Sequence, residues 1–214
     1  MVNKIRKNLT EEQLVQIEKA VGAAEKNTRG EIVPVAVASA DHYEFVLYRS
    51  PVIVGLIVST LFFIFFRPLS AAQLFLTQLI SFAATYFLLS QFPQLKYFLL
   101  THTEINQAVD QKSMELFYQY HLDRTEKRTG ILIVIFLEEK TVKVLADEGI
   151  NQLVPPKTWD LVVSDMITEI KEKNVASAMI LGIKRCGEIL SQKVPASNRN
   201  PNELSNELRG PLTP

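Results

Sequence analysis

The feature that most constrains this chain is a long apolar run at residues 51–92, in which Arg67 is the only charged residue. About 20 apolar residues cross the hydrocarbon core of a bilayer, so the run is too long for one crossing and suits two. Pro68 cannot continue a helix without losing a hydrogen bond, and it favours a turn at Arg67. The sequence predicts a transmembrane helical hairpin at residues 49–95, with spans at about 51–66 and 70–92.

Outside the hairpin, three short runs are typical of β-strands. Two are continuous apolar runs, as in buried strands, and the third alternates apolar and polar residues across a short polar turn from the second. Pro34, in the first run, favours an edge strand or a bulge because proline cannot donate a ladder hydrogen bond. The predicted strands are residues 31–38, 130–137 and 141–148.

Helical periodicity predicts helices at about residues 9–27 and 103–122, and two more that follow Pro155 and Asn174. The strand before the hairpin has only one amphipathic helix with which to bury its faces. A lone strand of that kind is not stable, so we expect it to join the two later strands. The predicted fold is α/β: a small, three-layer-like arrangement of one sheet covered by helices, interrupted by the hairpin.

This fold divides the chain into parts. One domain is built from residues 1–48 and 96–194, and the polar, proline-punctuated tail at residues 195–214 is predicted to be disordered. Both parts of the domain must lie on the same side of the membrane, which requires an even number of crossings. The argument from the fold and the argument from length therefore agree on two spans.

The charges near the hairpin predict its orientation. Arg49 and Lys96 flank the ends that lead to the domain, whereas the loop between the spans carries only Arg67. The positive-inside rule therefore predicts an integral protein of the inner (cytoplasmic) membrane with its domain in the cytoplasm. The single cysteine, Cys186, and an N-terminus without the apolar segment of a signal peptide agree with this expectation.

Composition and motifs limit the classes of function. Lysine plus arginine and aspartate plus glutamate number 23 each, so no basic excess supports nucleic-acid binding. The sequence contains none of the motifs G-x-S-x-G, H-E-x-x-H and C-x-x-C, and no Walker loop. Within the two predicted spans no side chain is ionisable, which favours an anchor over a transport pathway.

Two segments resemble a known family. They are AAEKNTRGEIVPV at residues 23–35 and MELFYQYHLDRTEKRTGILIVIFLEEKTVKVLADEGINQLVP at residues 114–155. Together with the two helices that follow, they are similar to the TPM domain family, in a branch that has membrane spans between the first strand and the second helix. The family is named from a thylakoid lumen protein, a photosystem II repair protein and a nematode receptor-accessory protein.

The resemblance implies several functions, because members of the family are described as acid phosphatases, as calcium-binding proteins or as factors that assist membrane complexes. We expect a non-catalytic binding or assembly and maintenance factor for a membrane-protein complex. The alternative is a metal-dependent, calcium-linked phosphatase that acts near the membrane surface. The expected partners are the lipid bilayer and either another membrane protein or a second copy bound through the hairpin.

Two clusters are candidate sites. Asp147, Glu148 and Asn151 follow the third strand and offer oxygen ligands of the kind that calcium prefers. The alternative for this segment is a polar turn in which Gly149 supplies a positive φ angle.

The second cluster is the charged turn after the helix at residues 103–122. Arg124 and Arg128 are predicted to hold an anion such as a phosphate or a lipid headgroup. The alternative is a connector held by salt bridges.

Overall fold

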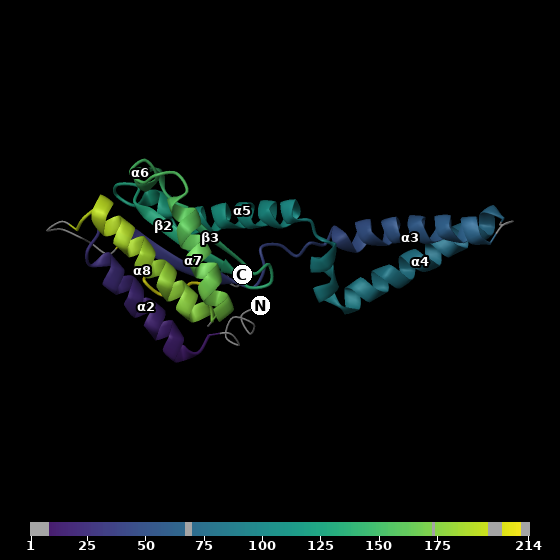
Figure 1. Cartoon of the computed structure of the whole chain (residues 1–214), viewed down its shortest axis with the longest axis horizontal. Coiled ribbons are helices and arrows are strands. Elements are labelled where there is room, and N and C mark those ends of the chain that lie inside the picture. The colour runs from purple at the N-terminus through teal and green to yellow at the C-terminus, as the bar shows by residue number, and fades with distance from the viewer. Residues whose placement is uncertain (1–8, 67–69, 173, 197–202, 211–214) are drawn as a thin grey trace. The chain divides into compact units, whose positions relative to one another are not determined.

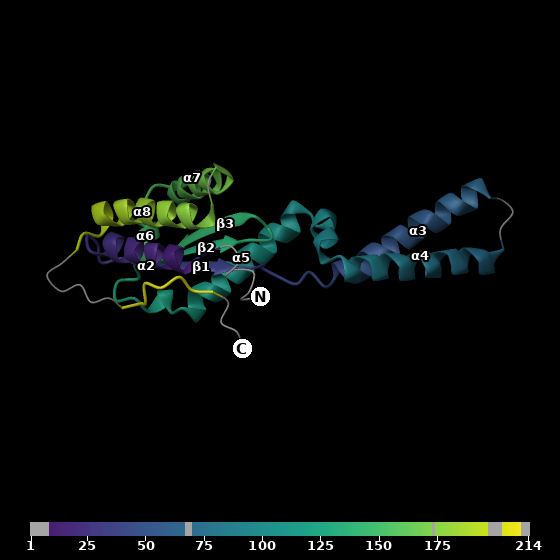
Figure 2. The ribbon, with the colours of Figure 1, turned by 90° about the horizontal axis from the view of Figure 1, so that it is seen from below.

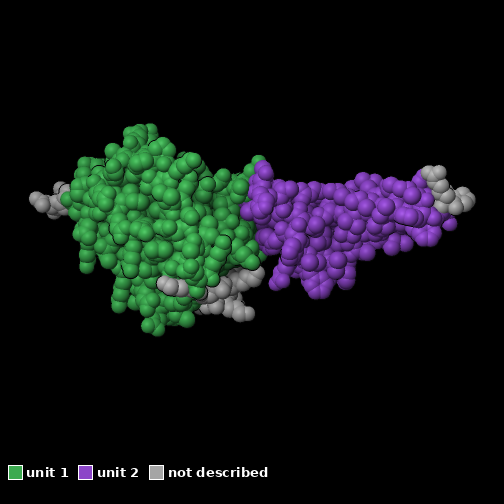
Figure 3. Space-filling model, viewed as in Figure 1, with its two compact units in different colours: residues 1–40, 106–214 green, residues 41–105 purple. Residues whose placement is uncertain are grey.

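The structure is a computed structural model that describes residues 9–66, 70–172, 174–196 and 203–210. The chain forms two compact units, one of residues 1–40 and 106–214 and the other of residues 41–105 (Figure 3). The first unit contains the sheet and the second contains the apolar helices (Figure 1).

The first unit is built on three strands, β1 (Glu31–Val37), β2 (Gly130–Phe136) and β3 (Thr141–Ala146). Their order is β1-β2-β3, with β1 parallel to β2 and β3 antiparallel to β2. The strand that precedes the two long apolar helices therefore pairs with a strand that follows them, and the predicted α/β sheet is confirmed. β1 lies at an edge, which explains how the sheet accommodates Pro34.

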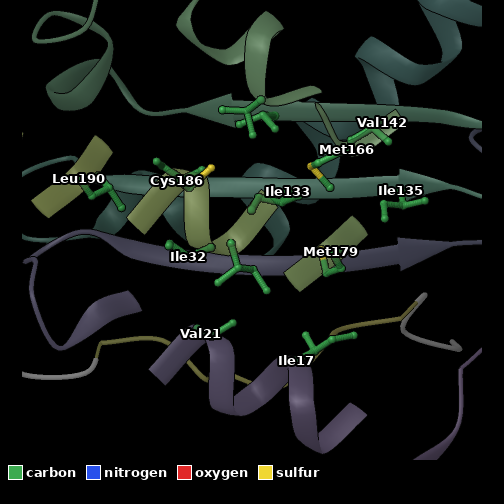
Figure 4. Close-up of a cluster of buried hydrophobic side chains, with 14 of the residues drawn as sticks. Ile17, Val21, Ile32, Ile133, Ile135, Val142, Met166, Met179, Cys186 and Leu190 are labelled. Atoms are coloured by element: carbon green, nitrogen blue, oxygen red, sulfur yellow. The ribbon is translucent and has the colours of Figure 1, made fainter. Parts of the chain in front are cut away.

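One face of the sheet is covered by α2 (Glu11–Glu25), α7 (Thr158–Glu172) and α8 (Val175–Lys193). Their apolar stripes meet alternate residues of the strands (Figure 4). This core includes Ile17, Val21, Ile32, Ile133, Met166, Met179, Cys186 and Leu190. Burial raises the pKa of the Cys186 thiol to about 12, so this cysteine acts as a small core residue.

The opposite face of the sheet is covered by α5 (His102–Gln119), which lies across the sheet from α7 and α8 (Figure 2). Side chains alternate along a strand, so the neighbours of Ile32 and Ile133 in sequence point toward α5. On this side the ammonium of Lys143 in β3 lies 2.6 Å from a carboxylate oxygen of Asp110 in α5. Helices therefore cover both faces, as predicted.

Several helix ends follow from local signals. Thr10 and Gln13 form the predicted capping box of α2, with hydrogen bonds of 2.8 and 3.3 Å. The Asn174 side chain caps α8 by accepting a hydrogen bond from the amide of Ser177 at 2.9 Å. The four-residue helix α6 (Glu148–Asn151) is not predicted from the sequence. The predicted third strand continues to residue 148, whereas β3 ends at Ala146 and α6 begins two residues later.

The second unit contains α3 (Val46–Phe65), α4 (Ala71–Gln91) and the 3-10 helix η1 (Pro93–Leu99). By length and composition, α3 and α4 can each cross a membrane. A Cβ atom on Gly55 of α3 would lie 3.3 Å from the backbone carbonyl of Gln78 in α4, so the two helices pack closely. The helix α3 begins before the predicted span and continues through Pro51. The predicted turn at Arg67 and Pro68 lies outside the described residues.

The C-terminal segment differs from the prediction. The backbone N–H of Arg209 donates to the carbonyl of Pro34 at 3.0 Å, and the N–H of Ala36 donates to the carbonyl of Arg209 at 3.0 Å. Residues 203–210 therefore lie along the edge of β1, and the prediction of disorder is wrong for them. A polar segment can be ordered when an open strand edge supplies its hydrogen-bond partners. The rest of the predicted tail beyond residue 196 lies outside the described residues.

Candidate functional site

The candidate site lies at the edge of the sheet where β1 and β2 begin and β3 ends. This arrangement follows from the topology, since β1 and β2 are parallel and β3 runs the opposite way. The charged turn at residues 121–129 leads into β2, and the segment at residues 147–151 leaves β3. The two clusters predicted as separate sites are therefore brought together.

An ion pair between Arg128 and Asp147 joins the clusters. Nε of Arg128 lies 3.1 and 3.2 Å from the two carboxylate oxygens of Asp147, and Nη2 lies 2.8 Å from one of them. The carboxylate is buried, with 4% of Asp147 exposed, whereas Arg128 remains exposed. The hydrogen bonds to Asp147 raise the pKa of the Arg128 guanidinium.

Asp147 also positions the backbone around it. Its side chain accepts a hydrogen bond from the N–H of Glu148 at 2.7 Å and so caps α6. Its own N–H donates to the carbonyl of Gly130 at 2.9 Å, which ties the end of β3 to the start of β2. These contacts favour a structural role for a carboxylate that the sequence suggested as a metal ligand.

Gly149 is required by a close contact between α6 and the charged turn. A Cβ atom at this position would lie 2.6 Å from the carbonyl oxygen of Arg128 and would also collide with the carbonyl oxygen of Lys127. No described glycine has a positive φ angle, so the prediction that Gly149 supplies one is wrong. The residues that take the left-handed conformation here are His121 and Arg128, with φ of 58° and 55°.

Asn151 is held by two hydrogen bonds. Its side-chain amide donates to the carbonyl of Ala146 at 2.7 Å, and its oxygen accepts from the indole N–H of Trp159 at 2.8 Å. Glu148 is exposed and accepts a hydrogen bond from Gln152 at 3.1 Å. Among the described residues, no three or more histidine, cysteine, aspartate and glutamate side chains form a group that could hold a metal ion. The calcium site stays a prediction.

Arg124 differs from Arg128 in its surroundings. It ends the short 3-10 helix η2 (Leu122–Arg124), is exposed, and forms no ion pair with any residue in the described part of the chain. Within the described residues, the predicted anion site at Arg124 and Arg128 therefore has one guanidinium without an ion pair and one that is bound to Asp147. Anion binding at this pair also stays a prediction.

Sequence reasoning missed two buried glutamates near this edge. Glu25 ends α2 and is 8% exposed, and Glu31 begins β1 and is 3% exposed. Burial raises the pKa of Glu25 to about 8 even though the backbone N–H of Ile32 donates to its carboxylate at 2.8 Å. Burial also raises the pKa of Glu31. A sequence signal existed, because Glu31 is the one charged residue of an otherwise apolar strand.

Comparisons with known proteins agree with this architecture. A family model described as the TPM domain matches residues 94–189, a segment that includes Arg128 and Asp147 and excludes β1. The NMR structure of the BA42 protein from the psychrophilic bacterium Bizionia argentinensis superposes with a TM-score of 0.58. That match has 21% sequence identity and covers 94% of each chain, which shows a shared fold. Comparison with curated proteins finds no match.

Proposed function

We propose that this protein is a membrane-anchored TPM-like domain that serves as a non-catalytic binding or assembly and maintenance factor for a membrane-protein complex. The observation that carries the proposal is the place of α3 and α4 in the chain. They interrupt one sheet, since the chain leaves β1, passes through both apolar helices and returns to form β2. A domain built this way stays within reach of the bilayer.

The topology follows from the same observation. Because β1 and β2 are neighbours in one sheet, two crossings must return the chain to the side that it left. Arg49 and Lys96 flank the spans on that side, which favours the cytoplasmic face of the inner membrane. In this proposal residues 1–48 and 96–194 form the domain and residues 49–95 form the hairpin.

The environment of the candidate site supports binding over catalysis. The carboxylate of Asp147 accepts hydrogen bonds from Arg128 and from the N–H of Glu148. These partners fix the backbone of two segments, which favours a structural role for this carboxylate over a catalytic one.

The hairpin itself supports an anchor. Many large apolar side chains of α3 and α4 are exposed, as lipid contact requires, and beyond Arg49 the two helices contain no Asp, Glu, Lys, Arg or His. Such a surface can also contact another membrane protein or a second copy.

Photo-crosslinking in native membranes tests the proposal. A photoreactive residue is placed at exposed Ile80 in α4 or at exposed Leu161 in α7, with exposed Lys184 in α8 as a matched surface control. We expect a discrete adduct with one membrane protein from Ile80 or Leu161 and none from Lys184. Adducts with lipid alone at Ile80, and no protein adduct at Leu161, would overturn the proposal.

The second candidate is the metal-dependent, calcium-linked phosphatase that the TPM resemblance implies. The acidic segment at Asp147 and Glu148, placed where a strand ends, is the observation that favours it. Purified full-length protein is assayed against p-nitrophenyl phosphate with calcium, magnesium or manganese, together with Asp147→Asn. Hydrolysis that Asp147→Asn abolishes would replace the first proposal, whereas calorimetry that shows no metal binding would remove the second.

A further inference from the structure

The outer edge of β1 is closed in an unusual way. Backbone groups at alternate residues of this strand point away from β2, and these are Ile32, Pro34 and Ala36. The N–H of Ile32 donates to the Glu25 carboxylate at 2.8 Å, proline has no N–H, and the N–H of Ala36 donates to Arg209 at 3.0 Å. An open edge is a template for pairing with another strand, and here residues 203–210 cover it.

The covering segment reproduces the contacts of a bound peptide. Arg209 forms a parallel bridge with Val35, and its guanidinium lies 4.6 Å from the centre of the Tyr120 ring. The Tyr120 hydroxyl donates to the carbonyl of Gly210 at 2.9 Å. The side chain of Arg209 therefore makes a cation–π contact with Tyr120, while hydrogen bonds hold the neighbouring backbone.

At the other end of the segment, Glu31 holds the peptide backbone. Its two carboxylate oxygens accept hydrogen bonds from the successive N–H groups of Glu203 and Leu204, each at 3.2 Å. These contacts involve main-chain atoms, so they would be available to any extended segment. Glu31 therefore holds the main chain at one end of the segment, and the π face of Tyr120 suits a basic side chain at the other end.

The chain's own segment is only partly buried on this surface, and Leu208 is the residue of it that packs against the core. No residue of 203–210 is fully buried, and only Arg209 pairs with the strand. Burial is the main cause of the raised pKa of Glu31, and the like charge of Glu203 adds a smaller contribution in the same direction. A segment without an acidic residue at that position would avoid this repulsion.

We propose that the outer edge of β1, together with Glu31 and Tyr120, is a docking groove for an extended segment of a partner protein, and that residues 203–210 occupy it until the partner binds. The partner's segment carries an arginine at the position of Arg209 and no acidic residue at the position of Glu203. It adds a parallel strand to β1. This inference rests on the binding function proposed above and names the surface that performs it.

The test uses labelled synthetic peptides and fluorescence anisotropy. The peptides comprise residues 203–210 with the native sequence, with Glu203→Gln or with Arg209→Ala. The proteins are the full chain and a chain that ends at residue 202, both in nanodiscs. We expect the shortened chain to bind the native peptide saturably and the Glu203→Gln peptide more tightly, because the repulsion from Glu31 is removed.

Two further differences are expected. The Arg209→Ala peptide should bind about tenfold more weakly, as the loss of a partly buried cation–π contact predicts. The full chain should bind the native peptide at least about tenfold more weakly than the shortened chain, because its own segment competes intramolecularly. A shortened chain that unfolds cooperatively but does not bind the peptide would overturn the groove, as would equal binding by both chains.

A second variant covers the case in which the shortened chain does not fold. The full chain with Arg209→Ala weakens its own segment, so it should bind the native peptide more tightly than the parent, while Glu172→Gln, at an exposed position of α7, should leave peptide binding unchanged. A stable dimer of the full chain that Arg209→Ala dissociates would assign the groove to a second copy and overturn the partner proposal. Failure of peptide binding while crosslinking still captures a partner would overturn the groove alone.

Discussion

Arg128 holds the buried carboxylate of Asp147 through hydrogen bonds of 2.8, 3.1 and 3.2 Å, and this contact fastens the charged turn to the end of β3. Arg128 precedes β2 and Asp147 follows β3, so the whole of both strands lies between the two residues in the sequence. The ion pair therefore joins two segments at one edge of the sheet, and its removal should lower the free energy of unfolding before it changes any activity.

The first prediction concerns this ion pair. Asp147→Ala removes the partner of Arg128 and the cap of α6, so we expect a loss of about 1–2 kcal/mol in the free energy of unfolding. Asp147→Asn keeps an oxygen for the N–H of Glu148 and should lose less. Chemical denaturation in detergent measures both, with exposed Glu148→Gln as the control. Equal stability of Asp147→Ala and the parent would show that the pair is not structural.

The second prediction concerns Gly149. An added methyl group would collide with two backbone carbonyls of the charged turn, which cannot move as a side chain can. We expect Gly149→Ala to lower the free energy of unfolding by about 2 kcal/mol.

Gly22→Ala is the matched control for this substitution. Gly22 lies within α2, where an added Cβ would meet only the side chain of Asn206 at 3.3 Å. Alanine is also the better helix former, so Gly22→Ala should be neutral or stabilising. A larger loss at Gly22 than at Gly149 would contradict the proposed close contact.

The third prediction is a pH dependence of stability caused by Glu25. Its pKa is raised from 4.5 to about 8 in the folded protein, so the folded state binds a proton more tightly than the unfolded chain does. The resulting stabilisation is complete below pH 4.5 and is lost as the pH rises through about 8. The melting temperature should therefore fall between pH 5 and pH 9 in the parent.

Glu25→Gln should remove most of this slope and raise stability at pH 9, since the glutamine oxygen can still accept from the N–H of Ile32. The expected gain at pH 9 is on the order of 2–4 kcal/mol. Exposed Glu18→Gln on the same helix should leave the slope unchanged. A slope that persists in Glu25→Gln would assign the pH dependence to other groups, including Glu31, whose pKa is raised in the same direction.

The fourth prediction concerns topology. Reporters fused before residue 1 and after residue 214 should lie on the same side of the membrane, because β1 and β2 belong to one sheet. A reporter inserted after Phe66 should lie on the opposite side. Cysteine-labelling or enzyme-fusion assays in cells measure all three positions. Termini on opposite sides would contradict both the two-span hairpin and the continuous sheet.

Most of the fold could be predicted from local patterns. The apolar run indicated α3 and α4, valine-rich and isoleucine-rich runs indicated β1 and β2, and Pro34 pointed to an edge strand. The errors lie where local patterns compete, as at residues 147 and 148, which continue an alternating strand in sequence but begin α6 in the structure. There the side chain of Asp147 binds the N–H of Glu148 and turns the backbone into a helix.

The candidate site was less predictable. The sequence singled out Asp147 and Arg128 but assigned them to a cation site and an anion site, whereas the structure pairs them. It also gave no role to Glu25 or Glu31, because burial depends on which elements pack around a side chain. Charge type is visible in a sequence, but the neighbour that satisfies the charge is not.

The sequence by itself determined that two long apolar helices lie between the first two strands of an α/β fold, because hydropathy and periodicity are properties of neighbouring residues. Only the tertiary structure decided that Arg128 closes on Asp147, that Gly149 must lack a side chain, and that residues 203–210 lie along β1. Each of these depends on groups that meet across the fold. The physical reason is that an unpaired strand edge or a buried charge selects its partner by position in space, which the spacing along the chain does not specify.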